Sequence, residues 1–213
     1  SDLSRLGRVR IIFFGSPDFA LPALEALRAD HEIALVVTQP PRPCGRGQRC
    51  LSTPVEERAR ALGLEVVTPK AVRTAAFADR LRALGADYLV VVAFGRILPA
   101  AVLGAARHGA LNIHPSLLPR WRGPAPVPWT LFHGEPVTGV SVMQMNEEMD
   151  AGDLVRQVLT PVDPDENADR LLCRLASLGA ATLAGVLAEE EAAGERLPRV
   201  PQNEALATRA PLI

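Results

Sequence analysis

Three side chains, Asn112, His114 and Asp150, have the types and spacing of a site for acyl transfer. Asn112 and His114 lie two residues apart in the apolar run 111–114, which predicts a strand, so both project from one strand face. Asp150 lies in an acidic turn after a second strand-like segment, 138–145. If that segment joins the same sheet, we expect its carboxyl end to bring Asp150 to the edge where His114 lies.

This trio suits the transfer of an acyl group to an amine. An amide such as that of Asn112 donates to the oxyanion of a tetrahedral intermediate, a contact worth roughly 2.7–4 kcal/mol in other enzymes. A histidine carries protons near neutral pH, and a carboxylate beside it fixes its tautomer, holds a water or favours the imidazolium. Ser116 lacks the strand-turn-helix elbow of a hydrolase nucleophile. No second histidine stands three or four residues from His114, so we expect no metal site.

The elements that must position these residues follow an α/β pattern. The apolar run 9–14 predicts a strand buried on both faces, Ser16 and Pro17 predict a helix start, and 33–38 predicts a second strand. This β-α-β opening predicts a parallel sheet with right-handed crossovers. Gly15-Ser16-Pro17 is not a GxGxxG element, so no dinucleotide site is expected. Further strands are predicted at 64–67, 88–93, 138–145 and 154–159, the last two as an antiparallel hairpin, and helices at 54–62, 75–84, 100–106, 127–132 and 169–191.

Residues 39–53 form a long segment rich in proline, glycine and arginine. Loops longer than about 12–15 residues without structure of their own are usually functional or disordered. One interpretation is a solvated surface loop. The other is an arm that contacts phosphates through Arg42, Arg46 and Arg49, because the guanidinium group matches the planar geometry of phosphates. Composition leaves both interpretations open.

Composition is that of a globular chain with one main core. Of its 213 residues, 48% are hydrophobic and 22% are charged. With a net charge of −1, the chain lacks the overall positive charge that is typical of nucleic-acid-binding proteins. No apolar run approaches the roughly 20 residues needed to span a bilayer. The three cysteines match no zinc spacing and are expected to be free thiols in a reducing cytoplasm.

Two motifs around these residues resemble the signature of the folate-dependent formyltransferase family. The run 112–119 (NIHPSLLP) with Arg122-Gly123 is similar to the family's catalytic strand and loop, and 149–153 (MDAGD) is similar to its catalytic aspartate turn. The resemblance covers nearly the whole chain. It implies a Rossmann-like, mostly parallel sheet with helices on both faces. It also implies a catalytic domain over 1–193 and a linker or tail over 194–213, toward a C-terminal domain that this chain lacks.

The resemblance further implies substrates and residue roles. The formyl donor is expected to be 10-formyltetrahydrofolate, and the acceptor the amino group of methionyl initiator tRNA, because 14–20 (FGSPDFA) and 38–48 (TQPPRPCGRGQ) resemble segments of family members that act on tRNA. Asn112 would stabilise the oxyanion, His114 would carry the proton, and Asp150 would orient His114 and a relaying water. The pterin pocket would be lined by Phe94, Gly95, Arg96, Ile97, Leu98, Pro99 and Met145. The tRNA would be bound by Arg42, Arg46, Arg49, Ser116, Arg120 and Arg122.

Two other functions stay open at this point. One is a formyltransferase that acts on an amino sugar or another small amine. The other is a folate- or RNA-binding module without turnover. We expect a cytoplasmic monomer that does not associate with membranes and holds no metal.

Overall fold

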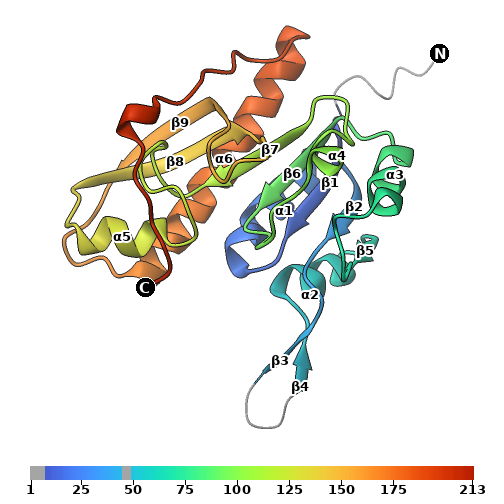
Figure 1. Ribbon diagram of the computed structural model, residues 1–213, viewed down its shortest axis with the longest axis horizontal. Coiled ribbons are helices and arrows are strands. Elements are labelled where there is room, and N and C mark those ends of the chain that lie inside the picture. Colours follow the sequence, from blue (N-terminus) through green and yellow to red (C-terminus); the bar gives the residue numbers. More distant parts are fainter. Residues whose placement is uncertain (1–7, 45–48) are drawn as a thin grey trace. The chain divides into compact units, whose positions relative to one another are not determined.

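The computed structural model describes residues 8–44 and 49–213 (Figure 1). Contacts within the chain divide it into two compact units, residues 1–110 and residues 111–213. Each unit is described by itself.

The first unit contains a parallel sheet, as the β-α-β opening predicts. Ile11, Phe13 and Val90 are completely buried, which is the environment of strands covered on both faces. The carboxyl ends of the strands meet at one edge, where ligands bind in open α/β sheets. The strands are β1 (Arg10–Gly15), β2 (Glu32–Val37), β5 (Val66–Val67) and β6 (Tyr88–Val92), in the order β5-β2-β1-β6 with every neighbouring pair parallel.

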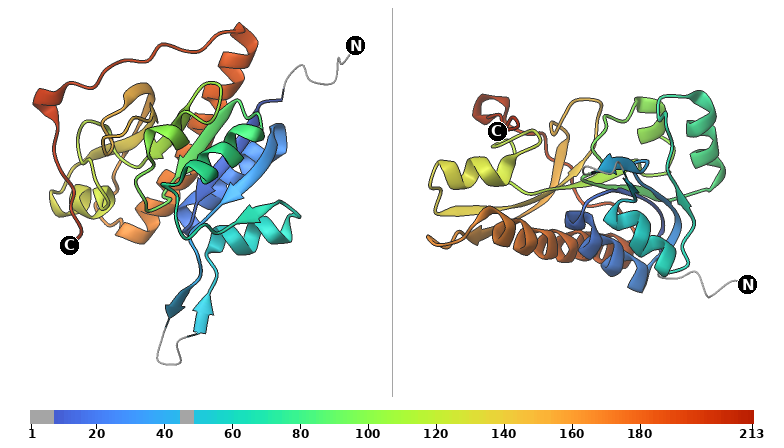
Figure 2. Two further views of the ribbon diagram at one scale, coloured as in Figure 1. Left: turned by 45° about the vertical axis from the view of Figure 1, so that its right-hand side comes forward. Right: turned by 90° about the horizontal axis from the view of Figure 1, so that it is seen from below.

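Helices cover both faces of this sheet. In the view from below in Figure 2, α1 (Leu21–Asp30) and α2 (Pro54–Ala61) lie on one face, and α3 (Ala75–Ala83) and α4 (Ala100–Leu103) lie on the other. This is the arrangement that right-handed crossovers between parallel strands produce. The first unit therefore has the predicted Rossmann-like architecture.

Helix starts in the first unit agree with prediction at two positions and differ at a third. Thr53 and Thr74 cap α2 and α3, since their hydroxyl oxygens accept from the backbone N–H three residues later, at 3.0 and 3.2 Å. The predicted cap at Ser16 is wrong. A 3-10 turn (η2, Asp18–Ala20) precedes α1, and Ser16 Oγ accepts instead from the backbone N–H of Gln39, at 3.2 Å. The hydroxyl thus fixes the chain just after β2.

Residues 39–52, called the arm below, leave the first unit after β2. The arm is not an irregular loop, because β3 (Arg42–Cys44) and β4 (Arg49–Leu51) pair as an antiparallel hairpin. Figure 1 shows this hairpin extending away from β2 and α2. At its base, Thr38 Oγ1 and Thr53 Oγ1 lie 2.5 Å apart and share a hydrogen bond. The two ends of the arm are therefore joined by side chains.

The second unit is built from antiparallel strands and one long helix. It confirms the predicted hairpin, formed by β8 (Val137–Gln144) and β9 (Asp153–Pro161), and it adds β7 (Ala110–His114) as the antiparallel neighbour of β8. The long helix, α6 (Ala168–Ala193), packs on β8 and β9, and the shorter helix α5 (Pro126–Phe132) packs on α6.

Helix α6 is long and apolar enough to cross a membrane by length and composition, contrary to our reading of the sequence. Half of its most apolar window is buried inside the structure. Leu171, Leu175 and Leu183 are completely buried. The apolar stripe of α6 is therefore that of a core helix packed on a sheet.

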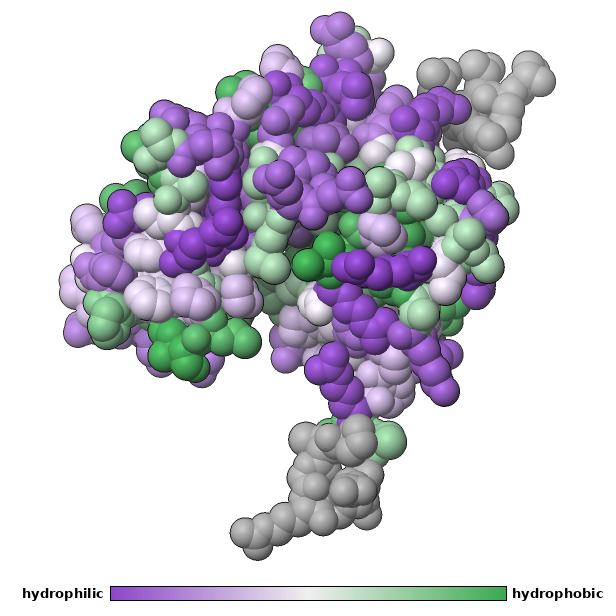
Figure 3. Space-filling model, in the orientation of Figure 1, coloured by the Kyte–Doolittle hydropathy of each residue, from purple (hydrophilic) through white to green (hydrophobic). Residues whose placement is uncertain are grey.

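Residues 199–210, called the strap below, follow α6 and belong to the second unit. Leu154 and Val200 exchange two backbone hydrogen bonds, of 2.8 and 2.9 Å. Trp129 Nε1 of α5 donates to the Pro211 carbonyl at 2.8 Å, and Figure 3 shows an apolar patch at the lower left over α5 and this end of the chain. The segment expected to be a linker is thus hydrogen-bonded along its length.

Candidate active site

Strand β7 presents Asn112 and His114 on one face. The intervening Ile113 points toward α6, since a Cβ built on Gly179 of that helix would lie 2.5 Å from Ile113 Cγ2. Side chains alternate along a strand, so Asn112 and His114 project from the face opposite α6. The two side chains named from the sequence therefore share the face of this strand that α6 does not cover.

The imidazole of His114 is contacted at both ring nitrogens. Its Nε2 lies 2.9 Å from the Trp121 carbonyl oxygen, and its Nδ1 lies 3.6 Å from Asp150 Oδ1. A carbonyl oxygen only accepts, so Nε2 carries a hydrogen in the first contact. The second distance is too long for a direct hydrogen bond, so the carboxylate acts on Nδ1 as a nearby negative charge. His114 is 5% exposed, where such a charge is weakly screened.

Asp150 reaches His114 by a route that differs from our expectation. Because β8 is antiparallel to β7, Gln144 at its carboxyl end pairs with Leu111, at the start of β7 and away from His114. The turn that follows, residues 145–152, returns to His114. There Asp150 adopts φ 54°, and its Oδ2 accepts from the Gly123 backbone N–H at 2.8 Å.

A glycine allows this turn to pass close to β8. A Cβ at Gly152 would lie 1.9 Å from the Gln144 carbonyl oxygen, a contact that no side chain tolerates. Met145, expected in the pterin pocket, is half-buried at the start of the same turn. The path of the Asp150 turn (residues 145–152) thus depends on Gly152.

Ser116 stabilises the loop that follows β7. It is completely buried, and its hydroxyl donates to the Arg120 carbonyl at 2.6 Å. From β8, Ser141 Oγ donates to the Ser116 carbonyl at 2.7 Å and accepts from Leu118 N at 3.1 Å. The peptide bond between Leu118 and Pro119 is cis. The environment of Ser116 is therefore that of a loop anchor, and the structure does not place its hydroxyl for the substrate contact expected from the sequence.

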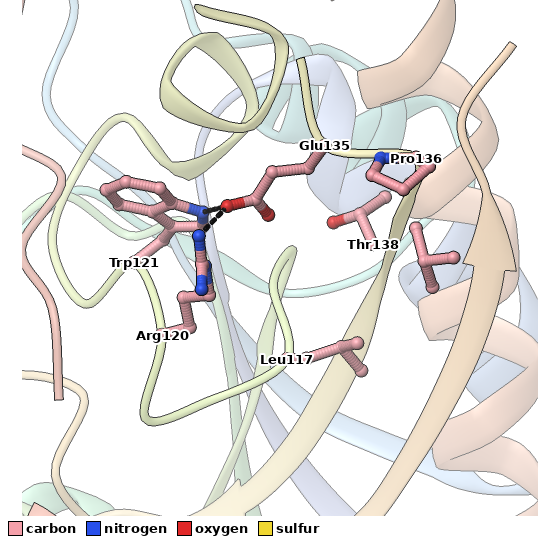
Figure 4. Close-up of a pocket in the computed structure, with 7 residues that line it drawn as sticks. Leu117, Arg120, Trp121, Glu135, Pro136 and Thr138 are labelled. Atoms are coloured by element: carbon pink, nitrogen blue, oxygen red, sulfur yellow. Dashed lines mark hydrogen bonds and ion pairs between the residues drawn. The ribbon is translucent and has the colours of Figure 1, made fainter. Parts of the chain in front are cut away.

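The two arginines of this loop differ in environment. Arg120 is about half exposed. Its guanidinium pairs with Glu135 and lies 5.2 Å from the centre of the Trp121 ring. Figure 4 shows Arg120 and the Trp121 indole both directed at Glu135, beside a cavity of about 290 Å³. This arginine remains accessible to an anionic partner.

Arg122, in contrast, is 3% exposed. Its guanidinium donates to Gln202 Oε1 at 2.8 and 3.0 Å and to the Glu204 carboxylate at 2.7 and 2.9 Å. These hydrogen bonds from Arg122 hold the pKa of Glu204 below its ordinary value. Arg122 therefore anchors the strap, and it does not extend a phosphate-binding surface as expected from the sequence.

In the first unit, the loop expected to line the pterin pocket is only partly accessible. Phe94 and Leu98 are 2% exposed and belong to the core. Arg96 donates to the backbone carbonyl of Pro69 at 3.0 Å. Pro99 precedes α4 and is half-buried. Of the residues expected to line this pocket, Gly95 and Ile97 are exposed, while the others are buried or half-buried and support the loop.

The arm provides the basic residues that the sequence assigns to phosphate contact. Arg42 is exposed at the start of β3, and Arg49 lies in β4, while Arg46 lies outside the described residues. A cavity of about 380 Å³ lies at the base of the arm, lined by residues that include Ser16, Gln39 and Phe94. These residues follow β1, β2 and β6, so the cavity lies at the ligand-binding edge of the parallel sheet.

Sequence reasoning missed the groups that hold His114 and Asp150 in place. Trp121 and Gly123 make their contacts through backbone atoms, for which no side-chain pattern gives a signal. Gln202 donates to the backbone of the Asp150 turn from 52 residues away. Over residues 8–44 and 49–213, no group of three or more His, Cys, Asp or Glu side chains is arranged to hold a metal ion.

Comparisons with known proteins agree with the fold and the motifs. Residues 8–187 match the family model described as formyl transferase. The chain is 44% identical over 209 residues to the methionyl-tRNA formyltransferase of Syntrophus aciditrophicus, covering 98% of this chain and 66% of that relative. The chain thus spans slightly less than two thirds of the relative's length.

Solved structures confirm the expected fold class. Glycinamide ribonucleotide transformylase 1 from Symbiobacterium toebii has a TM-score of 0.71 at 24% identity, covering 91% of this chain and 94% of that chain. An N-formyltransferase from Helicobacter canadensis, solved with folinic acid and dTDP-3-aminofucose, has a TM-score of 0.67 at 15% identity, covering 95% and 71%. At these identities the likeness concerns the fold alone.

Proposed function

Because the chain belongs to the formyl transferase family, we propose that it transfers a formyl group from 10-formyltetrahydrofolate to the amino group of methionyl initiator tRNA. Membership of this family is what the NIHPSLLP and MDAGD motifs led us to expect. The observation that carries the proposal is the position of His114, between the Trp121 carbonyl and the Asp150 carboxylate and on the strand face that also presents Asn112.

The two contacts of His114 define how it acts. With Nε2 hydrogen-bonded to Trp121 O, Nδ1 is the nitrogen available for proton movement. When Nδ1 carries a proton, it faces the Asp150 carboxylate at 3.6 Å. His114 then supplies both a proton and a positive charge close to Asn112.

The reaction needs no covalent nucleophile from the chain. The amine nitrogen of the acceptor bonds to the formyl carbon, the bond from that carbon to the donor nitrogen breaks, and one proton moves from the amine to the donor nitrogen. The Asn112 amide donates to the formyl oxygen as negative charge develops there, a role worth roughly 2.7–4 kcal/mol in other enzymes. His114 carries the proton, a role worth on the order of 10²–10⁴-fold.

The choice of a tRNA acceptor is supported by the arm. Arg42 and Arg49 lie on its two strands, and arginine recognises phosphate oxygens in a planar, bidentate manner. Most contacts that position a protein on nucleic acid are made to phosphate and sugar. A basic hairpin on a chain of net charge −1 therefore provides a local surface for the acceptor end.

A direct assay distinguishes this function from its alternatives. The purified chain is mixed with 10-formyltetrahydrofolate and either methionyl-tRNA or nucleotide amino sugars, and the formylated product is detected by mass. We expect product with methionyl-tRNA. Transfer only to an amino sugar would replace the proposed acceptor, and folate binding without transfer to either substrate would indicate a binding module.

The same assay tests the site. His114→Ala is expected to lower kcat by about 10²–10⁴-fold, because it removes the proton carrier. His108→Ala is the matched control, since His108 packs against the Tyr88 ring in the first unit. Equal rates for the wild type and His114→Ala would contradict the proposed mechanism.

A further inference from the structure

Both residues that contact the His114 ring have unusual backbone conformations. Trp121, whose carbonyl meets Nε2, has φ 61°, and Asp150, whose carboxylate faces Nδ1, has φ 54°. Residues other than glycine rarely adopt such angles, and they keep them only where the surrounding contacts fix them. The position of the imidazole therefore depends on whatever holds these two residues.

The strap holds the Asp150 side. Gln202 is 8% exposed, and its Nε2 donates to the carbonyl of Asp150 at 2.8 Å and to that of Gly152 at 2.7 Å. Its Oε1 accepts twice from the buried Arg122 guanidinium, so the orientation of the amide is fixed. One side chain thus joins the Asp150 turn to the loop that carries Trp121.

The strap also holds the Trp121 side. Thr208 Oγ1 accepts from the Trp121 backbone N–H at 2.9 Å, and the Thr208 carbonyl accepts from the Arg122 N–H at 2.9 Å. Ala210 N donates to the Arg122 carbonyl at 2.7 Å. A Cβ at Gly123, which has φ 117°, would lie 3.0 Å from the Ala210 carbonyl oxygen. The loop and the strap are therefore in close backbone contact next to the left-handed Trp121.

We propose that the strap is a positioning element of the active site, in which Gln202 fixes Asp150 and Thr208 fixes Trp121, so that His114 is held from both sides. Neither side chain contacts the His114 ring, so each acts through the residue that it holds. The kinetic part of this inference rests on the proposed formyl transfer. The structural part, the position of the imidazole, does not depend on which reaction the site catalyses.

Substitutions at Gln202 separate its two contacts. Gln202→Glu keeps an oxygen for the Arg122 guanidinium but replaces the amide donor with an oxygen that faces the Asp150 and Gly152 carbonyls. Gln202→Ala removes both contacts. Thr208→Val keeps the shape and the backbone bonds of residue 208 and removes only the acceptor for the Trp121 N–H. Asn203→Ala is the matched control, because Asn203 is exposed in the strap and its side chain caps only residues 204–206.

The kinetic experiment measures kcat and KM for both substrates. For Gln202→Glu, Gln202→Ala and Thr208→Val we expect kcat to fall about 10- to 100-fold. This is the range found in metalloenzymes for residues that orient a metal-binding side chain without contacting the metal. We expect KM to stay within about twofold, because no substrate contact is removed. Asn203→Ala is expected to match the wild type in both constants. A rise in KM without a fall in kcat, or an unchanged kcat in all three variants, would overturn the proposal.

A second measurement keeps the test independent of turnover. Nitrogen-15 NMR of labelled histidine, without substrates, reports each ring nitrogen of His114, assigned by comparison with His114→Ala. We expect Gln202→Glu to shift mainly the Nδ1 signal and Thr208→Val mainly the Nε2 signal. If wild-type enzyme transfers no formyl group, these shifts still test the strap. If Gln202→Ala fails to fold, Gln202→Glu supplies the result, and unshifted signals in the folded variants refute the role of the strap.

Discussion

His114 is held by one contact at each ring nitrogen, and the two contacts respond differently to substitution. The contact at Nε2 comes from the Trp121 backbone carbonyl, which no side-chain change at position 121 removes. The contact at Nδ1 comes from the Asp150 carboxylate, whose charge can be removed while its shape is kept. Asp150 is therefore the residue at which the electrostatic part of the site can be tested separately from its geometry.

We expect Asp150→Asn to lower kcat by about 10²–10⁴-fold while the fold is retained, because the negative charge 3.6 Å from His114 Nδ1 is lost. Asparagine still accepts from Gly123 N and tolerates the left-handed conformation, so the unfolding free energy is expected to change by less than about 1 kcal/mol. Urea unfolding and mass-detected formyl transfer check the two effects. Asp153→Asn, at the start of β9, is the control, and a wild-type kcat for Asp150→Asn would refute the charge effect.

At the scale of elements, α6 covers the face of β7 opposite Asn112 and His114. Its Gly179 leaves room for Ile113, and its Gly185 faces open space, since a Cβ there would meet nothing within 4 Å. Packing therefore requires glycine at position 179 of this helix but not at position 185. The first allows close packing against the strand that carries Asn112 and His114, whereas the second only lowers the stability of the helix.

We expect Gly179→Ala to destabilise the protein by about 1–3 kcal/mol, because the new methyl group overlaps the branched, stiff side chain of Ile113. It should also lower kcat, since relief of the overlap displaces β7. Gly185→Ala is expected to stabilise the protein by about 1 kcal/mol and to leave kcat unchanged. Thermal and urea unfolding measure both changes. A destabilised Gly185→Ala, or a Gly179→Ala variant as stable as the wild type, would contradict this account of the packing.

The arm gives a prediction for acceptor binding. Arg42→Ala is expected to weaken tRNA binding and to lower the slope of log affinity against log salt concentration by about one unit, because one phosphate contact is lost. Arg28→Ala removes the same charge from an exposed position in α1 and is expected to leave the slope unchanged. Filter binding at several salt concentrations measures the slope. Equal effects of the two substitutions would indicate that only net charge matters.

Sequence signals that act over a few residues predicted the helix caps well. Thr53 and Thr74 cap helices because their partners lie three residues away. Ser16 carries the same local signal, but its hydroxyl has a partner 23 residues away in the chain, which local sequence does not reveal. The strand that precedes the Asp150 turn was predicted, whereas its antiparallel pairing with β7 was not, since both directions give the same alternation of side chains.

At the scale of the whole molecule, the strap shows what sequence alone does not determine. The segment 194–213 that contains it has three prolines and no periodicity, so the sequence indicates a linker. Its bonds to the loop after β7 join residues 80 or more positions apart, such as Arg122 with Gln202 and Trp121 with Thr208. Such pairings depend on how β8, β9 and α6 return the chain to the loop after β7. Local sequence patterns therefore do not reveal them.

Stability is expected to fall in acid. Arginine hydrogen bonds hold the pKa of Glu166, Glu189 and Glu204 below the ordinary value of 4.5. A carboxyl group with a lowered folded pKa contributes stability above its unfolded pKa and loses that contribution as the pH falls through the folded pKa. The thermal midpoint of the wild type, measured from pH 7 to pH 3, should therefore drop below about pH 4.5.

The Glu204 contribution can be isolated by substitution. Glu204→Gln keeps a hydrogen-bond acceptor for Arg122 but has no charge to titrate, so its thermal midpoint is expected to lie closer to that of the wild type at pH 3 than at pH 7. The same scans measure this convergence. A difference between the two proteins that is constant over the whole pH range would show that the carboxylate adds nothing that depends on its charge.

The hydrogen bond between Thr38 and Thr53 at the base of the arm has an evolutionary consequence. A hairpin whose two ends meet can be shortened, lengthened or exchanged without moving the strand before it or the helix after it. The arm is therefore a separable segment of the fold. Under the proposed function, selection for a different acceptor can act on the sequence of the arm while β7 and the Asp150 turn stay in place. Exchange of the arm between relatives would then change the acceptor without changing the proposed chemistry.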